Sequence, residues 1–207
     1  MTISITEHEA QAYQNKARVS KQAGFNLIEA AIVLGIVGLI VGGIWAAAAS
    51  AYENMRQQSA SKNLLSLAQN VRGFYAQNQA TSIDGNTENL FSLGLIPADM
   101  VVGGAGTHTI RHQWGGTVDV IDASASTSLA SFEVRFNSMN SEACRNFIMR
   151  NGNAARGSGL LQIKTDSGMV MDIGSDSTAT TDIANVNTKC GTGAGQKNVS
   201  FVFSVGG

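Results

Sequence analysis

The sequence predicts an α+β protein in which a long N-terminal helix packs on an antiparallel β-sheet. Two observations predict this class. A helical pattern runs without a break from about Phe25 to Asn78, and the rest of the chain mixes short alternating stretches with short helical ones. Mixed elements joined by short connections are typical of an antiparallel sheet with helices beside it.

The first half of the predicted helix has the length and composition of a membrane span. The twenty residues from Ala30 to Ala49 carry no charge, and about 20 apolar residues in a helix cross the hydrocarbon core of a bilayer. Lys16, Arg18 and Lys21 precede them, which predicts a cytoplasmic N-terminus and an outside location for everything after residue 50. A secretory signal cleaved near Ala47–Ala49 and an uncleaved signal anchor are alternative interpretations.

Glu29 is a carboxylate at the edge of this apolar run. An acid that reaches the bilayer centre costs on the order of 2–3 kcal/mol, and such residues usually have a function. The alternative is that Glu29 reaches back to the lipid headgroups. Gly38, Gly42 and Gly43 weaken the helix, but no proline interrupts it, so we expect it to be continuous in the isolated subunit.

The second half of the predicted helix is amphipathic. One apolar stripe recurs at steps of mostly three and four residues, which predicts packing against a globular head. Its members are Tyr52, Met55, Leu64, Leu67, Ala68, Val71, Phe74 and Tyr75. The opposite, polar face is predicted to contain Arg56, Gln57, Lys62, Asn63 and Gln69.

The head, from about residue 80 to residue 207, contains further helical and strand patterns. Helices are predicted at Glu88–Leu93 and at Ser141–Arg150, the second capped by Ser141 with Cys144, Phe147 and Ile148 facing inward. Strands are predicted at Thr117–Ala123, at Leu129–Asn137 as a half-buried strand, and at Asn198–Ser204. Leu160–Thr165 and Met169–Ile173 flank Asp166-Ser167-Gly168 and predict a hairpin.

Cys144 and Cys190 are the two cysteines of the chain. Both follow the apolar segment, on the side that the predicted orientation places outside the cytoplasm. Thiols in an oxidising compartment usually pair, so a disulfide is expected. Two buried, unpaired cysteines are the alternative.

The composition and the polar motifs argue against an enzyme, a metal site and a nucleic-acid partner. The formal net charge is −1 and charged residues make up 14%, which gives no reason to expect phosphate-backbone binding. His108 and His112 have no nearby Cys or acidic ligand and make a poor zinc site, so with Arg111 they are expected on the surface or in a loop. Asp166, Asp172 and Asp176 do not form the dense acidic loop that calcium prefers. No catalytic residue, metal or cofactor is predicted.

The junction Gly24-Phe25-Asn26-Leu27-Ile28-Glu29 resembles the processing site of type IV pilins, in which a Gly precedes the mature N-terminus and a Glu follows before the apolar helix. The resemblance implies that a prepilin peptidase cleaves between Gly24 and Phe25 and methylates the amine of Phe25. It also implies that Glu29 pairs with the terminal amine of a neighbouring subunit during assembly. Phe at the first mature position is typical of the a subclass, whereas the long leader resembles the b subclass.

The head also resembles the b subclass. The matching segments are Trp114-Gly115-Gly116, Glu142-Ala143-Cys144 and Lys189-Cys190-Gly191-Thr192-Gly193. The similar proteins are major subunits of the toxin-coregulated, bundle-forming and conjugative thin pili. Their pattern implies a disulfide between Cys144 and Cys190.

The resemblance implies four regions and a structural function. These are a leader (1–24), the transmembrane or filament-core half of the helix (25–51), its amphipathic half (52–79) and the head (80–207). The implied function is that of a major pilin, a self-associating subunit of a helical homopolymer used for adhesion, aggregation or conjugative contact. A minor pilin or a type II secretion pseudopilin is the alternative.

The implied partners and location follow from the same resemblance. The partners are other copies, the prepilin peptidase and the inner-membrane assembly machinery. Before assembly the chain is expected in the inner membrane with its head in the periplasm, and afterwards in an extracellular pilus.

Overall fold

The computed structural model describes residues 26–78, 85–124, 130–154, 157–173, 181–193 and 195–206. The chain divides into two compact units, the first ending at Ala49 and the second beginning at Ser50. The long helix α2 (Leu27–Gln77) contains this boundary. Its ends lie within two residues of those expected from the periodicity.

The part of α2 in the first unit is an unbroken helix, as predicted. Asn26 precedes it and accepts a hydrogen bond from the Ile28 N–H through Oδ1 at 3.3 Å, in the manner of an N-cap. The helix passes through Gly38, Gly42 and Gly43, because a glycine only weakens a helix, whereas a proline would remove a backbone donor.

The part of α2 in the second unit buries most of the predicted apolar stripe, including Leu64, Leu67 and Val71. The stripe begins later than predicted, because Tyr52 and Met55 are 59% and 65% exposed. Nearly all of Gln57 and Asn63 is buried, although both were assigned to the polar face. The Asn63 amide tolerates burial because it donates to Asp99 Oδ2 at 2.8 Å.

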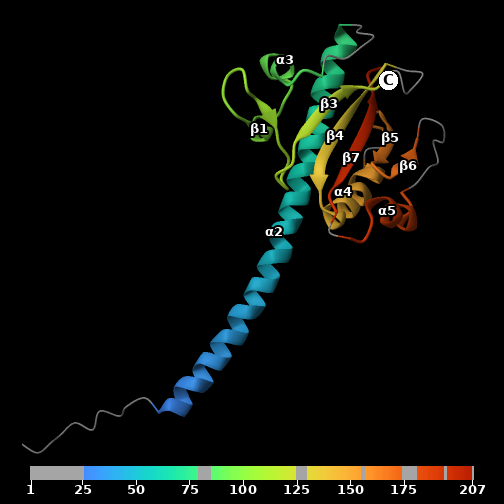
Figure 1. The fold of residues 1–207 in the computed structure, drawn as a ribbon. Coiled ribbons are helices and arrows are strands. Elements are labelled where there is room, and N and C mark those ends of the chain that lie inside the picture. Colours follow the sequence, from blue (N-terminus) through green and yellow to red (C-terminus); the bar gives the residue numbers. More distant parts are fainter. Residues whose placement is uncertain are drawn as a thin grey trace, which may run out of the picture. The chain divides into compact units, whose positions relative to one another are not determined.

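A five-stranded antiparallel sheet forms the centre of the second unit (Figure 1). Its strands are β3 (Val118–Asp122), β4 (Ser131–Met139), β5 (Leu160–Thr165), β6 (Gly168–Asp172) and β7 (Lys197–Ser204). Their order is β3-β4-β7-β5-β6, so the last strand of the chain lies in the middle and pairs with both β4 and β5. The α+β class, the β5–β6 hairpin and the final strand are therefore confirmed.

Strand β4 differs from the half-buried strand that its alternation predicts. Most of its side chains are buried, and these include Glu133 on the face expected to be polar. Glu133 forms an ion pair with Arg135 at 2.7 Å, and Arg135 Nε also donates to Ser200 Oγ on β7 at 3.4 Å. A central strand has neighbours on both edges, and its buried carboxylate is stable because it is paired.

The other elements of the head are short. They are α3 (Thr87–Ser92), the 3₁₀ turn η2 (Ala98–Met100), the paired strands β1 (Val101–Val102) and β2 (Thr109–Ile110), α4 (Ser141–Ala154) and α5 (Ile183–Cys190). The predictions of α3 and α4 are confirmed, whereas η2, β1, β2 and α5 were not predicted. The elements η2, β1 and β2 have only two or three residues each, too few for a periodic pattern to emerge.

The expected cap of α4 was wrong by one residue. Asn140, not Ser141, accepts the hydrogen bond from the Ala143 N–H through Oδ1 at 2.7 Å. The Ser141 hydroxyl donates instead to the Gly193 carbonyl at 2.7 Å. Both residue types suit a cap, and only the tertiary contact with residue 193 decides between them.

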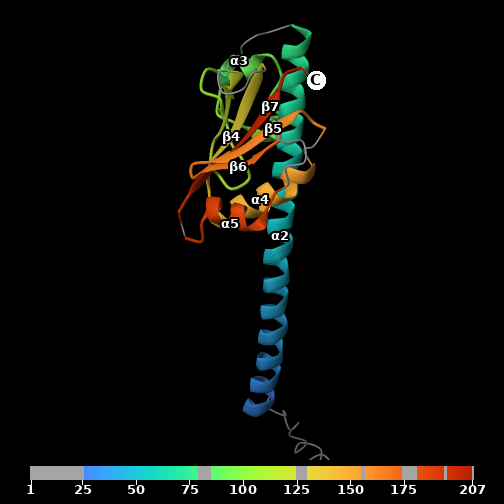
Figure 2. The same cartoon turned by 90° about the vertical axis from the view of Figure 1, so that its right-hand side faces the viewer.

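The core of the second unit joins α2, α4 and the sheet. Leu64, Leu67 and Val71 of α2 belong to one buried cluster with Phe136 of β4 and Phe147 of α4. The Phe136 and Phe147 rings meet edge to face at 4.8 Å between centroids, a favoured aromatic geometry. Figures 1 and 2 show α4 and α5 side by side at one end of the sheet and α3 at the other.

Candidate assembly site

In the first unit, α2 presents large apolar side chains to the outside on all of its faces. Leu34, Leu39 and Trp45 are examples, each more than two thirds exposed. Within the described residues, the apolar stretch of α2 is long enough to span a membrane and none of it is buried. A continuous apolar surface of this size requires lipid or another protein chain around it.

Glu29 lies in the first turn of this helix and is the acid of that turn. Its side chain is exposed, as are those of Leu27 and Ile28 before it. A carboxylate near a helix N-terminus is favoured by the helix dipole, so this position stabilises the negative charge of Glu29 within the single chain. The two residues of the predicted cleavage junction, Gly24 and Phe25, lie outside the described residues.

The predicted pairing of Cys144 and Cys190 is present as a disulfide. The bond joins α4 to α5, with 5.8 Å between the Cα atoms and a sequence separation of 46. Both sulfurs lie in the core, because neither residue has exposed surface. The partner helix α5 was missed, although Asp182 supplies a recognisable N-cap by accepting from the Ala184 N–H at 3.2 Å.

Two hydrogen bonds hold the segment after α5 against α4. The Ser141 hydroxyl donates to the Gly193 carbonyl, and Arg145 Nη1 donates to the Gly191 carbonyl at 2.7 Å. Arg145 and Cys144 are adjacent on α4, so the disulfide and the guanidinium fasten the same two segments. Helix α4 is therefore joined to α5 by a disulfide and to the segment after α5 by hydrogen bonds.

His112 lies in a loop, which was one of the two expected locations, but it is buried and not on the surface. It is 5% exposed, its Nε2 lies 2.7 Å from the Asn137 carbonyl, and its Nδ1 accepts from the Trp114 N–H at 3.2 Å. Only the neutral tautomer with hydrogen on Nε2 satisfies both contacts. Burial lowers the pKa of His112, and the hydrogen bond to Asn137 opposes this effect.

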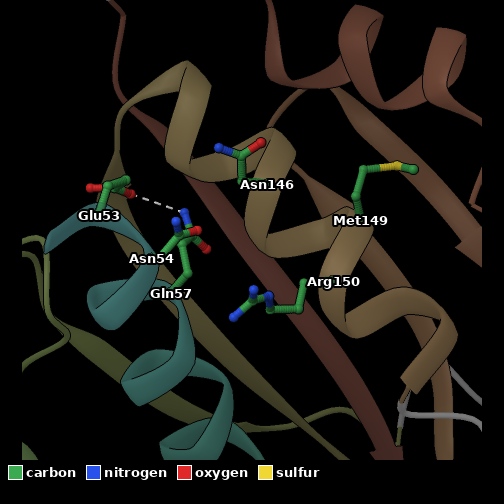
Figure 3. Close-up of a pocket in the computed structure, with 6 residues that line it drawn as sticks. All are labelled: Glu53, Asn54, Gln57, Asn146, Met149 and Arg150. Carbon is green, nitrogen blue, oxygen red and sulfur yellow. Dashed lines mark hydrogen bonds between the residues drawn. The ribbon is translucent and has the colours of Figure 1, made fainter. Parts of the chain in front are cut away.

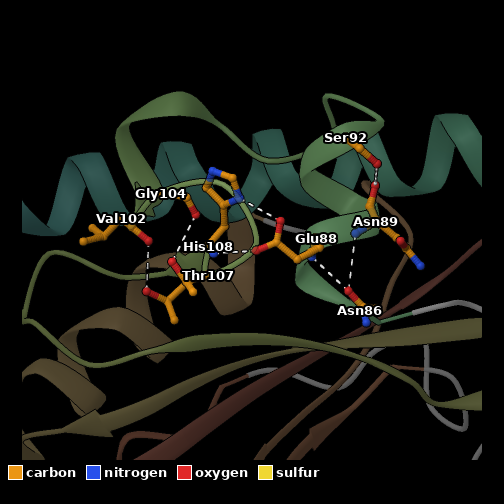
Figure 4. A network of polar contacts seen from close by, with 9 residues as sticks. Asn86, Glu88, Asn89, Ser92, Val102, Gly104, Thr107 and His108 are labelled. Carbon is orange, nitrogen blue, oxygen red and sulfur yellow. Dashed lines mark hydrogen bonds and ion pairs between the residues drawn. The ribbon is translucent and has the colours of Figure 1, made fainter.

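His108 binds Glu88 and so connects α3 to the segment before β2 (Figure 4). The Glu88 carboxylate accepts from the His108 backbone N–H at 2.5 Å and lies 2.8 Å from Nδ1 of the ring. The hydrogen bond with the His108 side chain is the largest of the effects that lower the pKa of the Glu88 carboxyl. Phe91 stacks on the His108 ring at 3.8 Å, so both histidines have structural contacts.

A groove of about 420 Å³ lies between α2 and α4 (Figure 3). Its lining comes from Glu53, Asn54 and Gln57 on α2 and from Asn146, Met149 and Arg150 on α4. Arg150 extends from α4 toward α2 in Figure 3. The sequence does not indicate this groove, because its residues come from two helices almost a hundred positions apart and match no motif.

Glu53 lines the groove, and its carboxylate accepts two hydrogen bonds from within the chain. Its Oε1 accepts from Gln57 Nε2 at 3.0 Å and from Trp114 Nε1 at 3.1 Å. Gln57 Oε1, on the other side of the same amide, is buried and accepts no hydrogen bond. Two donors therefore hold the Glu53 carboxylate in place within the protein.

The described residues contain no group of three or more His, Cys, Asp or Glu side chains that could hold a metal ion. Of the aspartates considered for calcium, Asp166 Oδ2 accepts from the Asn198 N–H at 2.8 Å and Asp172 Oδ2 accepts from Gln162 Nε2 at 3.3 Å. Asp176 lies outside the described residues. Asp166 and Asp172 thus form hydrogen bonds with residues of β7 and β5.

Comparisons with known proteins agree with this arrangement of helix, sheet and disulfide. A family model described as the PilS N-terminal domain matches residues 54–204. The type IVb pilin from Salmonella typhi is similar in structure, with a TM-score of 0.50 and 19% identity over 70% of this chain and 97% of that one. The type IV pilin TcpA from the Vibrio cholerae El Tor biotype has a TM-score of 0.51 and 18% identity over 72% of this chain and 99% of that one.

A search of curated protein sequences found no match. The two solved structures are less than 20% identical to this chain and establish the fold. The family model covers residues 54–204, which is more than half of the chain, and establishes the family. Pilins of this family are structural subunits that polymerise into pili, not enzymes. The chain therefore belongs to the PilS family of type IVb pilins.

Proposed function

We propose that this pilin is the major subunit of an extracellular type IVb pilus. The observation that carries the proposal is the apolar half of α2, which is unburied and carries one acid, Glu29, in its first turn. Such a helix is stable in a bilayer before assembly and among the helices of other copies afterwards. A carboxylate at its start then becomes a determinant of how the copies are aligned.

The proposed maturation begins at the cytoplasmic side of the inner membrane. A prepilin peptidase cleaves between Gly24 and Phe25 and methylates the new amine, while the head lies in the periplasm. The inner-membrane assembly machinery then adds the subunit to the filament. In the filament the Phe25 amine of one copy pairs with Glu29 of another, because neither charge is stable when buried alone.

The proposed filament makes contact between cells or with surfaces, by adhesion, aggregation or conjugative pairing. A minor pilin or a type II secretion pseudopilin is the alternative assignment. The disulfide between Cys144 and Cys190 and the long leader favour a b-type pilin over a pseudopilin. The acid at position 29 favours a subunit of the shaft over one confined to the tip.

Mass spectrometry of sheared surface filaments tests this proposal. We expect the chain to be the most abundant protein of the filament and to begin at Phe25 with a methylated amine. A mature start after Ala49, or an intact Met1, would contradict the maturation. Trace amounts in filaments built mainly of another pilin would instead identify a minor subunit.

A further inference from the structure

We propose that the groove between α2 and α4 receives the Glu142 carboxylate of a second copy of this chain, which pairs with Arg150. The inference rests on the proposed function, because it requires that copies assemble. It adds to that function a specific contact between heads. The cation and the acid belong to the same helix, α4, on different copies.

Arg150 is a cation that lines a groove and has no ionic partner among the described residues of its own chain. The acid nearest to it in the lining is Glu53, which already accepts from Gln57 Nε2 and Trp114 Nε1. Within the described residues, Arg135 pairs with Glu133, and the Glu88 carboxylate contacts the His108 ring. The Arg150 side chain is exposed, so an approaching chain can reach its guanidinium.

Glu142 is the complementary acid. Its side chain is exposed in the first turn of α4 and has no hydrogen-bond or ion-pair partner in the described part of the chain. Every other acidic side chain described in residues 50–207 accepts a hydrogen bond or forms an ion pair within the subunit. Among the described residues of the head, Glu142 is therefore the carboxylate that remains available to another molecule.

The spacing along α4 excludes pairing of these two residues within one copy. Glu142 and Arg150 are eight residues apart, which is about 12 Å along a helix axis, and side chains of one helix meet at three or four residues. A contact from the start of α4 on one copy to the groove beside the end of α4 on the next joins two different surfaces. Contacts of this kind repeat in one direction, and they build an open helical filament wherever the rotation between copies does not close into a ring.

The lining of the groove suits a carboxylate carried by protein. A guanidinium binds a carboxylate with two parallel N–H donors, and the Asn54 and Asn146 amides beside it can donate to the remaining lone pairs. Because Glu53 is also present, the lining has no net charge to attract a free anion. A carboxylate held on a neighbouring subunit has a high effective concentration there.

A charge exchange in the full-length pilin tests the pairing in cells that assemble the filament. Arg150→Glu and Glu142→Arg should each reduce the yield of sheared filaments by about tenfold or more, because each places two like charges in the contact. The double variant Arg150→Glu/Glu142→Arg should recover most of the yield, since it restores opposite charges. Glu142→Gln, which leaves Arg150 unpaired without repulsion, should have an intermediate effect.

Lys164→Glu is the matched control for Arg150→Glu. Lys164 has no ionic partner among the described residues and does not line the groove, and its substitution makes the same change in charge. We expect Lys164→Glu to assemble as the wild type does. We expect Arg150→Glu to restore filament yield when it is combined with Glu142→Arg, and we expect Lys164→Glu not to do so. In each variant, a disulfide-bonded monomer on a non-reducing gel of the membrane fraction verifies that the head has folded.

Normal filament yield in the Arg150→Glu and Glu142→Arg single variants would overturn the inference. Folded single variants that fail to assemble and are not rescued by the double exchange would overturn it as well. Neither result would contradict the proposed function, which fails only if the wild-type chain forms no filament or lacks the mature start at Phe25.

Discussion

His108 and His112 are four residues apart in the sequence but have different surroundings in the fold. His108 contacts Glu88 and Phe91 near the surface. His112 lies in the core, where both ring nitrogens are engaged, and Gly116 lies so close to its ring that a Cβ at position 116 would collide with Nε2. The two contacts of the His112 ring therefore fix its tautomer.

We predict that protonation of His112 destabilises the head in mild acid. Burial lowers its pKa in the folded state, so the unfolded chain, with an ordinary pKa of about 6.5, takes up the proton first. The contribution of neutral His112 to stability is complete above about pH 6.5 and is lost as the pH falls below it. Thermal unfolding of the mature chain in detergent between pH 7.5 and 5 measures this loss.

His112→Gln should flatten that pH dependence, even if it lowers stability at every pH. His108→Gln is the matched control, because this histidine is also engaged but lies outside the core, and its substitution should leave the His112 contribution in place. An unchanged pH dependence in His112→Gln would contradict the prediction.

At the scale of elements, the most constrained part of the head is the pair of helices α4 and α5. The disulfide joins them, and hydrogen bonds from Ser141 and Arg145 fasten the segment that follows α5. Phe147 of α4 packs edge to face on Phe136 and Phe201 of the sheet. The groove that is proposed to bind the next subunit lies along this same α4, so its geometry depends on how firmly α4 is held.

We predict that removing the disulfide with Cys144→Ala/Cys190→Ala strongly destabilises the head. Closing a loop with a sequence separation of 46 contributes about 4 kcal/mol on the chain-entropy model, a large part of the net stability of a domain. The midpoint of thermal unfolding should fall by on the order of 10 °C. Filament yield should fall with it, because a loosened α4 loses the groove.

Reduction provides the control for this variant. Dithiothreitol should lower the unfolding midpoint of the wild type and leave that of the double-alanine variant unchanged. A midpoint that is the same in both proteins under oxidising conditions would show that the bond contributes nothing to stability.

At the scale of the whole molecule, the two units that meet between Ala49 and Ser50 differ in whether their apolar side chains are buried. The second unit buries its apolar residues in its own core. The described residues of the first unit form a single helix, which cannot cover its own side chains, and these side chains are exposed. The first unit is therefore the part of the chain whose environment must be supplied by lipid or by other copies.

We predict that Glu29→Val leaves membrane insertion intact and reduces filament yield by more than about tenfold, as expected when one partner of a buried charge pair is lost. The change makes the helix more apolar, so insertion cannot suffer, but it removes the proposed partner of a neighbouring Phe25 amine. Amounts of pilin in membranes and in sheared filaments give the two measurements. Glu29→Gln should share the assembly defect, and normal piliation in Glu29→Val would show that the charge pairing is not needed.

The local sequence was sufficient to predict the elements with long or regular patterns. Helix α2, the β5–β6 hairpin and the buried face from Leu64 to Tyr75 all follow from side-chain periodicity, which reflects how a single element meets a core. The pairing of Cys144 with Cys190 follows from their number and from the predicted compartment. These properties depend on the chain's own composition and spacing, and so they are visible without a structure.

The tertiary structure alone decided which polar residues are buried and which side chains meet. His112 is buried against the Asn137 carbonyl, 25 residues away, whereas the buried Gln57 and Glu133 bond to Glu53 and Arg135 on their own elements. The groove combines Glu53 and Gln57 with Arg150, and neither helix alone indicates that the two will face each other. Periodicity reports which face of an element is apolar, whereas the position of a polar side chain depends on the partners that packing brings to it.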